Sequence, residues 1–207
     1  GIVPEPSPPL AVLRQVNSRA FASGLGQTLP GATFVTDLEQ ARDVLTTRPK
    51  VSRCWRVKRA FGMAGRGQKV FEPGVVEEAF LVPALRSGGL QIEPNVAIDT
   101  ELSLHAMLAA DGVCELGQVV RQRCNAAGSW LSTEVLVERA AFGAAIEGLT
   151  DEVQRVARAL HVAGYFGPFG VDAFTYRDLA GNLCWQPRSE INARYSMGFA
   201  VGFSRRT

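Results

Sequence analysis

Two strand-like segments near the C-terminus restrict the possible folds of this chain more than any other part of the sequence. Residues 169–176 (FGVDAFTY) and a run ending at Arg194 are separated by a Gly-Asn turn. This order of apolar and turn residues predicts an antiparallel β-hairpin. Alternate side chains of a strand share a face, so Glu190, Asn192 and Arg194 are expected to point the same way, with Asp172 beside them on the partner strand.

The row formed by Asp172, Glu190, Asn192 and Arg194 has side chains that suit a metal ion and a phosphate. Two carboxylates and an amide oxygen are ligands that Mg²⁺ accepts, and a guanidinium binds phosphate through several donors. The row therefore predicts a magnesium site with a phosphate clamp. A salt-bridged sheet edge facing solvent is the alternative interpretation.

A second segment, residues 48–73, combines strands with a glycine-rich loop. One strand ends at Lys58, the loop follows, and a second strand is expected over Gln68–Glu72. Gln68 stands where a Walker loop needs Lys, and no helix pattern follows as a dinucleotide fingerprint requires. One interpretation is a lid whose backbone amides close over phosphates above the Lys58 charge; the other is a flexible hairpin turn. The lid glycines are Gly62, Gly65 and Gly67.

The remaining pattern predicts an α+β chain. Helices are expected over Leu10–Leu25, Leu38–Leu45 (capped by Asp37), Val75–Arg86 and Thr150–Ala163 (capped by Thr150). Strands are expected over a short segment after residue 31 and over Leu90–Glu93, Ala97–Ala110, Val113–Cys124 and Leu131–Val137.

Composition excludes several classes. A net charge of +2 gives no support for a nucleic-acid surface, and no apolar run approaches the roughly 20 residues of a membrane helix. No signal-peptide pattern is present. The four cysteines form no CxxC pair, which disfavours zinc and favours reduced thiols in a cytoplasmic protein. Because the chain starts with Gly, its N-terminus is expected not to be the native one.

Five segments in order resemble the ATP-grasp superfamily, whose members clamp ATP between two α+β sub-domains with antiparallel sheets. They are VKRAFGMAGRG, IEPNV, ELSLH, GVDAF and EINARYSMG, spread over about 140 residues. The resemblance implies three parts: a helical lead-in and start of the domain (1–50), a small sub-domain with the glycine lid (51–97), and a larger sub-domain with the metal-binding sheet (98–207).

The resemblance also implies roles for individual residues. Lys58 and Arg194 act on the phosphates and the transferred phosphoryl group. The implied nucleotide-binding residues are Arg19, Lys58, the glycines 62, 65 and 67, Glu93 and Val96 at the adenine edge, and Glu101 at the ribose. The implied metal ligands are Asp172, Glu190 and Asn192, for Mg²⁺ with Mn²⁺ as an alternative.

A ligase of this kind phosphorylates a carboxylate to an acyl phosphate, which an amine or thiol then attacks. The rivals are an ATP-binding module without catalysis, a biotin-carboxylase-like enzyme and an α+β domain without a ligand. The spacing of 18 residues between Asp172 and Glu190 is longer than the resemblance implies, so a longer turn near residues 177–182 or a bulge near Pro187 is expected. Arg188 has no implied role. Few residues precede Lys58, so an upstream domain, a partner subunit or a homodimer is expected to complete the acceptor site.

Overall fold

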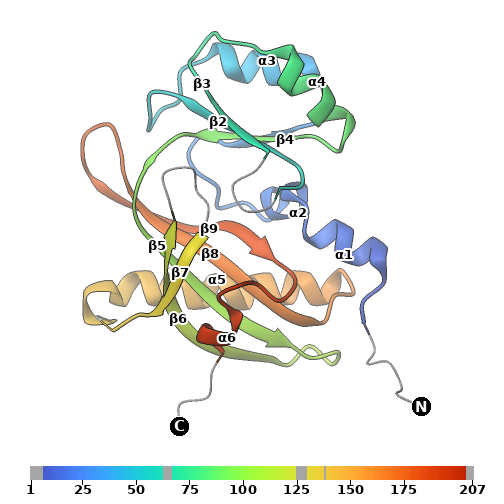
Figure 1. Ribbon diagram of the computed structural model, residues 1–207, viewed down its shortest axis with the longest axis vertical. Coiled ribbons are helices and arrows are strands. Elements are labelled where there is room, and N and C mark those ends of the chain that lie inside the picture. Colours follow the sequence, from blue (N-terminus) through green and yellow to red (C-terminus); the bar gives the residue numbers. More distant parts are fainter. Residues whose placement is uncertain (1–6, 63–66, 125–129, 138, 204–207) are drawn as a thin grey trace.

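The computed structural model describes residues 7–62, 67–124, 130–137 and 139–203 (Figure 1). In these ranges the chain forms two antiparallel sheets, each with helices packed on it. The α+β class expected from the sequence is confirmed.

The first sheet and its two helices make up the small lobe. Its strands lie in the order β1-β4-β2-β3. The elements are β1 (Thr33–Val35), α3 (Leu38–Thr46), β2 (Trp55–Arg59), β3 (Gln68–Phe71), α4 (Glu78–Arg86) and β4 (Leu90–Pro94). Alternate strand residues such as Val57 and Ile92 are buried against α3 and α4, which cover one face (Figure 1). The expected division at residue 51 does not coincide with a boundary between sheets, because β1 pairs with β4.

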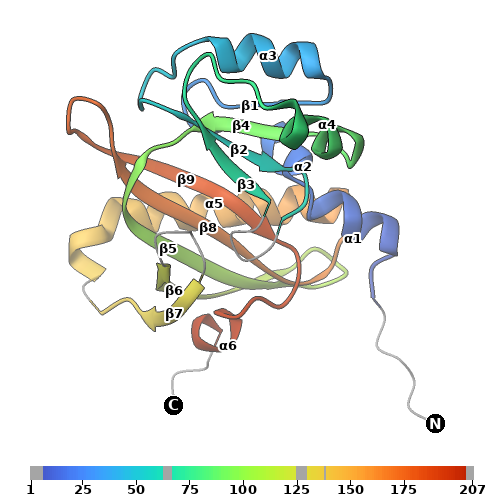
Figure 2. The same ribbon diagram turned by 45° about the horizontal axis from the view of Figure 1, so that its top comes forward.

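The second sheet forms the large lobe, in the order β7-β6-β5-β8-β9. Its elements are β5 (Ala97–Leu108), β6 (Cys114–Cys124), β7 (Trp130–Val135), η1 (Arg139–Phe142), α5 (Gly143–Val162), β8 (Gly167–Arg177), β9 (Leu183–Asn192) and α6 (Phe199–Gly202). Leu102, Leu104 and Val171 belong to the core that this sheet shares with α5. Figure 2 shows α5 and α6 on opposite sides of the sheet. Side chains that alternate with the core residues therefore face away from α5, toward α6 and the small lobe.

The long helix begins earlier than the sequence indicated. α5 starts at Gly143, and Thr150, expected as its N-cap, lies inside it. The Thr150 hydroxyl donates back to the carbonyl of Ile146 at 2.7 Å instead of capping. Leu149 is buried on the same face as Val153, so the apolar stripe extends N-terminal of Thr150.

The expected helix over Leu10–Leu25 is two helices, α1 (Leu10–Val16) and α2 (Arg19–Gly24). Ser18 is extended and caps α2, accepting a hydrogen bond from the Phe21 amide at 3.2 Å. α2 lies between the two lobes (Figure 1) and contacts β1, β4 and β9.

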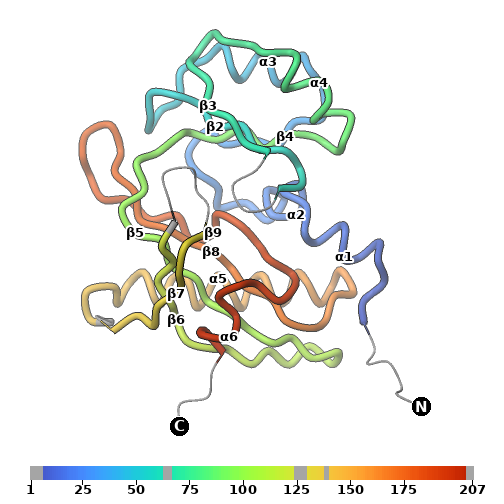
Figure 3. The backbone as a smooth tube through the Cα atoms, in the orientation of Figure 1, coloured from blue at the N-terminus to red at the C-terminus, as the bar shows by residue number. Residues whose placement is uncertain are grey.

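The hairpin of β8 and β9 contains the expected irregularity. Asp172 pairs with Glu190, whereas Phe174 pairs with Gln186, so β9 carries two extra residues at a bulge that includes Pro187. The turn at residues 178–182 connects the two strands. Figure 3 shows the backbone passing from the small lobe to the large lobe between β4 and β5. No helix in the described ranges has the length and apolar character needed to cross a membrane.

Candidate nucleotide and metal site

A cleft of about 1280 Å³ lies between the lobes and is lined from both. This volume is ample for a nucleotide and a second small molecule. The residues predicted from the sequence that line it are Arg19, Lys58, Gly62, Gly67, Glu93, Val96, Glu101, Asp172, Glu190, Asn192 and Arg194. Gly65, the remaining predicted residue, lies outside the described ranges. The fold thus gathers side chains from distant parts of the sequence around one cavity.

The small-lobe wall carries an ion pair. Lys58 on β2 and Glu93 on the neighbouring β4 approach to 2.6 Å between Nζ and Oε1. Each side chain is only 15% exposed. A cation and a hydrogen-bond acceptor therefore stand side by side, at the two positions for which the resemblance implies contacts with phosphate and adenine.

The segment between the lobes provides an apolar surface next to this pair. Val96 packs against a buried cluster of Leu29, Phe174 and Tyr176. Glu101 is half-buried on β5 and pairs in register with Phe174 of β8. An aromatic ring held at this surface would have polar partners at its edges.

The two residues that flank the loop between β2 and β3, Gly62 and Gly67, lie at the cleft. Gly67 has φ +78°, in the left-handed region that favours glycine, and its carbonyl accepts a hydrogen bond from the Arg59 amide at 2.9 Å. The expected strand–loop–strand hairpin is therefore present, with β2 and β3 paired antiparallel.

Asp172 lies on the large-lobe wall, on β8 between β5 and β9. Its Oδ1 accepts hydrogen bonds from Ser103 Oγ at 2.7 Å and Gln122 Nε2 at 2.8 Å, and its Oδ2 accepts one from Asn192 Nδ2 at 2.9 Å. Burial, reinforced by the carboxylate of Glu190 directly opposite, raises the pKa of Asp172 to about 7. A cation at this point would favour the ionised carboxylate.

Glu190 has a cationic partner from the N-terminal part of the chain. Arg19 Nη2 donates to Glu190 Oε1 at 3.0 Å, and Arg19 Nη1 donates to the carbonyl of Arg59 at 2.8 Å. The backbone amide of Arg19 also bonds to the carbonyl of Ala60 at 3.0 Å. Arg19 therefore bridges the two lobes at the cleft.

The expectation that β9 continues to Arg194 is wrong, because the strand ends at Asn192. The backbone amide and carbonyl of Ala193 pair with the side chain of Asn17, at 3.0 and 3.2 Å, in place of a ladder partner. Arg194 is exposed and still lines the cleft, and its Nη1 donates to Asn17 Oδ1 at 2.9 Å.

The large-lobe donors suit a small, hard cation. No group of three or more His, Cys, Asp or Glu side chains placed to hold a metal occurs in the described part of the chain, so the candidate set is two carboxylates and one amide. Asp172 and Glu190 face each other as like charges, and the burial of Asp172 penalises its ionisation. Asn192 presents its nitrogen to Asp172, and a rotation of the amide would present its oxygen to a metal. These residues fit Mg²⁺.

His105 is packed inside the large lobe. Its ring is 1% exposed, and Nε2 lies 2.8 Å from the hydroxyl of Ser196, which lines the cleft. Burial lowers the pKa of His105 to about 4, so the ring is neutral at pH 7. A side chain at Gly170, Gly198 or Gly202 would approach the ring to 2.9, 3.1 or 2.4 Å. These glycines allow the backbone to enclose the imidazole.

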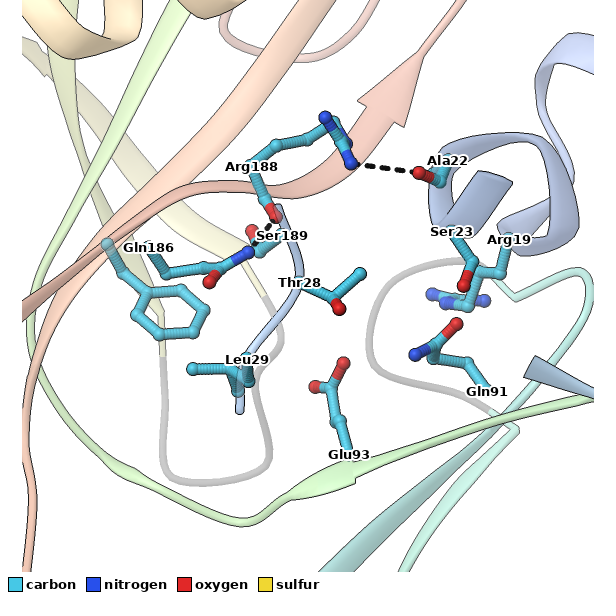
Figure 4. A pocket seen from close by; sticks show the side chains of 11 residues that line it. Arg19, Ala22, Ser23, Thr28, Leu29, Gln91, Glu93, Gln186, Arg188 and Ser189 are labelled. Carbon is cyan, nitrogen blue, oxygen red and sulfur yellow. Dashed lines mark hydrogen bonds between the residues drawn. The ribbon is translucent and has the colours of Figure 1, made fainter. Parts of the chain in front are cut away.

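Arg188, which the sequence left unassigned, is a buried structural cation. Its side chain and that of Glu152 on α5 are each 2% exposed and form an ion pair. Arg188 also donates to the carbonyls of Ala22 and Gly26. Figure 4 shows Arg188 reaching Ala22 beside a small cavity into which Glu93 points. That cavity, about 30 Å³, has room for water but not for a nucleotide.

Sequence reasoning missed the partners of the carboxylate row. Ser103 lies two residues after Glu101 on β5, so strand alternation alone was able to place both on one face. Gln122 and Asn17 had no such signal, because each reaches the site through tertiary packing.

The chain matches no family model and no curated protein sequence. Solved structures do resemble it. Biotin carboxylase from Campylobacter jejuni in complex with β-γ-ATP has a TM-score of 0.64 at 16% identity, over 97% of this chain and 49% of that one. N5-carboxyaminoimidazole synthetase from Staphylococcus aureus complexed with ADP has a TM-score of 0.60 at 15% identity, over 93% and 53%.

A third similar structure is the biotin carboxylase domain of Hydrogenobacter thermophilus 2-oxoglutarate carboxylase with MgADP, ADP and bicarbonate. Its TM-score is 0.61 at 16% identity, over 92% of this chain and 42% of that one. The chain thus spans about half the length of these structures. The three proteins belong to the ATP-grasp superfamily. The chain has the ATP-grasp fold, as its sequence motifs predicted.

Proposed function

We propose that this chain binds Mg-ATP and serves an ATP-dependent ligase, which phosphorylates a carboxylate to an acyl phosphate for attack by an amine or thiol. The observation that carries the proposal is the arrangement of charge in one cleft. Asp172, Glu190 and Asn192 stand on one wall, Lys58 and Glu93 on the other. The likeness to solved structures crystallised with ADP, MgADP or β-γ-ATP supports a nucleotide in this cleft.

The proposed orientation follows from the chemistry of each wall. The apolar surface around Val96 would receive adenine, with Glu93 accepting a hydrogen bond at its edge and Glu101 accepting hydrogen bonds from the ribose. Lys58 would exchange the carboxylate of Glu93 for phosphate oxygens, a stronger partner because of its higher charge. Backbone amides of the hairpin loop that contains Gly62 and Gly67 would close over the phosphates.

The large-lobe row would act at the transferred group. Asp172, Glu190 and Asn192 would hold Mg²⁺, with Mn²⁺ as an alternative, and the ion neutralises phosphate charge when bound. Arg194 would stabilise the negative charge of the γ-phosphoryl group as it moves to the acceptor. Arg19, bonded to Glu190 and to the carbonyl of Arg59, would hold the two walls in a fixed relative position. Closure of the cleft would exclude water that otherwise hydrolyses an acyl phosphate.

The proposal names the acceptor substrates only by their chemical class. Because the chain spans about half the length of the similar structures, we expect a further domain, a partner subunit or a second copy to complete the acceptor site. The substrates would be a small carboxylic acid and an amine or thiol, and the location the cytoplasm.

Thermal unfolding with and without Mg-ATP tests the proposal. Binding raises the melting temperature because ligand stabilises only the folded state, and Lys58→Ala is expected to weaken that response. The matched control is Lys50→Ala, at an exposed position outside the cleft lining. An unchanged melting temperature at millimolar Mg-ATP contradicts the proposal.

Phosphate release separates a ligase from its rivals. Release that needs an added pool of carboxylic acids and amines supports the ligase, and release that needs only bicarbonate indicates a biotin-carboxylase-like enzyme. Mg-ATP binding without release under either condition indicates a nucleotide-binding module without catalysis.

A further inference from the structure

Asn17, at the C-terminal end of α1, makes an unusually complete set of contacts with the end of β9. Its Nδ2 donates to the carbonyls of Leu13 at 2.9 Å and Ala193 at 3.2 Å. Its Oδ1 accepts from the amide of Ala193 at 3.0 Å and from Arg194 Nη1 at 2.9 Å. The amide group therefore uses both donor hydrogens and receives two donors at its oxygen.

These contacts fix the orientation of the Asn17 amide. An amide side chain supplies a donor and an acceptor on adjacent atoms, so Asn17 can pair with both backbone groups of Ala193 as a neighbouring strand would. The contact to Leu13 ties the same side chain to α1. Arg194 thus meets an acceptor whose position is set by three other hydrogen bonds.

The charge of its partner distinguishes Arg194 from Lys58 and Arg19. Arg56, which also lines the cleft, likewise meets neutral amide oxygens, those of Asn95 and Gln68. Lys58 is paired with Glu93 and Arg19 with Glu190, so a carboxylate compensates each. Asn17 is neutral. It orients the guanidinium without cancelling its positive charge.

We propose that Asn17 is a positioning residue that holds the Arg194 guanidinium at the cleft in an oriented, charge-uncompensated state, ready for an anionic group. The use of that charge on a transferred phosphoryl group rests on the proposed function, whereas the holding itself does not. Ser196, bonded to buried His105, restrains the same loop two residues farther on.

Nitrogen-15 relaxation of the arginine Nε–H groups tests the holding directly, with the Arg194 resonance identified by its loss in Arg194→Lys. Arg194 is expected to be more rigid than exposed Arg86 in the unsubstituted protein and as mobile as Arg86 in Asn17→Ala. Asn17→Leu keeps a similar side-chain volume without a donor or an acceptor and is also expected to free Arg194, which preserves the test if Asn17→Ala does not fold. Equal rigidity of Arg194 with and without Asn17 overturns the proposal.

Steady-state kinetics tests the consequence. Asn17→Ala is expected to lower kcat roughly tenfold to a hundredfold with little change in the KM for ATP, because misplacing a group acts at the reacting centre. Asn17→Ala combined with Arg194→Ala is expected to be no slower than Arg194→Ala alone, and multiplicative losses contradict the proposal. Asp37→Ala is the control: it removes the N-cap of α3 in the small lobe and should leave kcat unchanged.

The two hypotheses fail in different ways. An unsubstituted protein that neither binds nor cleaves ATP defeats the proposed function, while the relaxation experiment still decides the role of Asn17. Turnover of ATP by a protein in which the mobility of Arg194 does not change on substitution of Asn17 defeats only the role proposed for Asn17.

Discussion

Replacing Asp172 by Asn is expected to stabilise the free protein at pH 8 and to abolish its response to Mg-ATP. Burial and Glu190 raise the pKa of Asp172 from 3.8 to about 7. At about 1.4 kcal/mol per pKa unit, ionisation at pH 8 destabilises the folded state by at most about 4 kcal/mol. Asn removes this penalty but weakens the hydrogen bonds from Ser103, Gln122 and Asn192, by about 2 kcal/mol in total. The net gain is about 2 kcal/mol, or roughly 4–8 °C in melting temperature.

The stability difference between Asp172→Asn and the unsubstituted protein depends on pH. Because the folded-state pKa lies above the unfolded value, the native carboxyl keeps its proton longer as pH rises. Its stabilising contribution is complete below about pH 4 and is lost as pH rises through about 7. The advantage of Asp172→Asn should therefore grow from pH 4 to pH 8.

The assay is urea unfolding without nucleotide at pH 4.5, 6 and 8, followed by thermal unfolding with Mg-ATP. The control is Asp151→Asn, an exposed carboxylate on α5, whose effect should stay within about 0.5 kcal/mol. The reasoning is refuted if Asp172→Asn is less stable than the unsubstituted protein at pH 8, or if the difference between them does not change with pH. A preserved response to Mg-ATP refutes the metal assignment alone.

Three further outcomes are expected. Arg188→Ala should lower the free energy of unfolding by about 2–3 kcal/mol in urea titrations, because it removes one of the two arginine partners of buried Glu152, which keeps Arg155; a loss below about 1 kcal/mol contradicts this. Because the pKa of His105 is lowered to about 4 in the folded protein, the unfolded state binds more protons between pH 4 and 6.5. The free energy of unfolding should therefore fall by up to about 3 kcal/mol as pH drops through that window. His105→Gln should flatten this pH dependence, and an unchanged dependence contradicts the assignment to His105. A Cβ atom at residue 202 would lie 2.4 Å from His105 Nδ1, so Gly202→Ala should destabilise the packing of α6. The expected result is faster amide exchange over residues 199–203, and unchanged exchange would contradict it by showing that the imidazole ring moves to make room.

Much of the fold was predictable because its information is local. Asp37 caps α3 as expected, and β8 and β9 form the predicted hairpin with Asp172 opposite Glu190. The bulge near Pro187 is one of the two irregularities expected because the 18-residue spacing is longer than the resemblance implies. The errors lie where a side chain makes a hydrogen bond that periodicity does not report. Ser18 caps α2 and divides the expected N-terminal helix, Thr150 bonds back into α5, and Asn17 replaces a strand partner at the end of β9.

Strand alternation and the ordered motifs are local properties of the chain, and they were enough to predict a carboxylate row and a hairpin led by Lys58. The partners of these side chains depend on the fold. Arg19 meets Glu190, Gln122 meets Asp172 and Asn17 meets Arg194 across long stretches of chain. The physical reason is that periodicity reports only which face a side chain occupies. Charge compensation and burial depend on which faces the fold brings together.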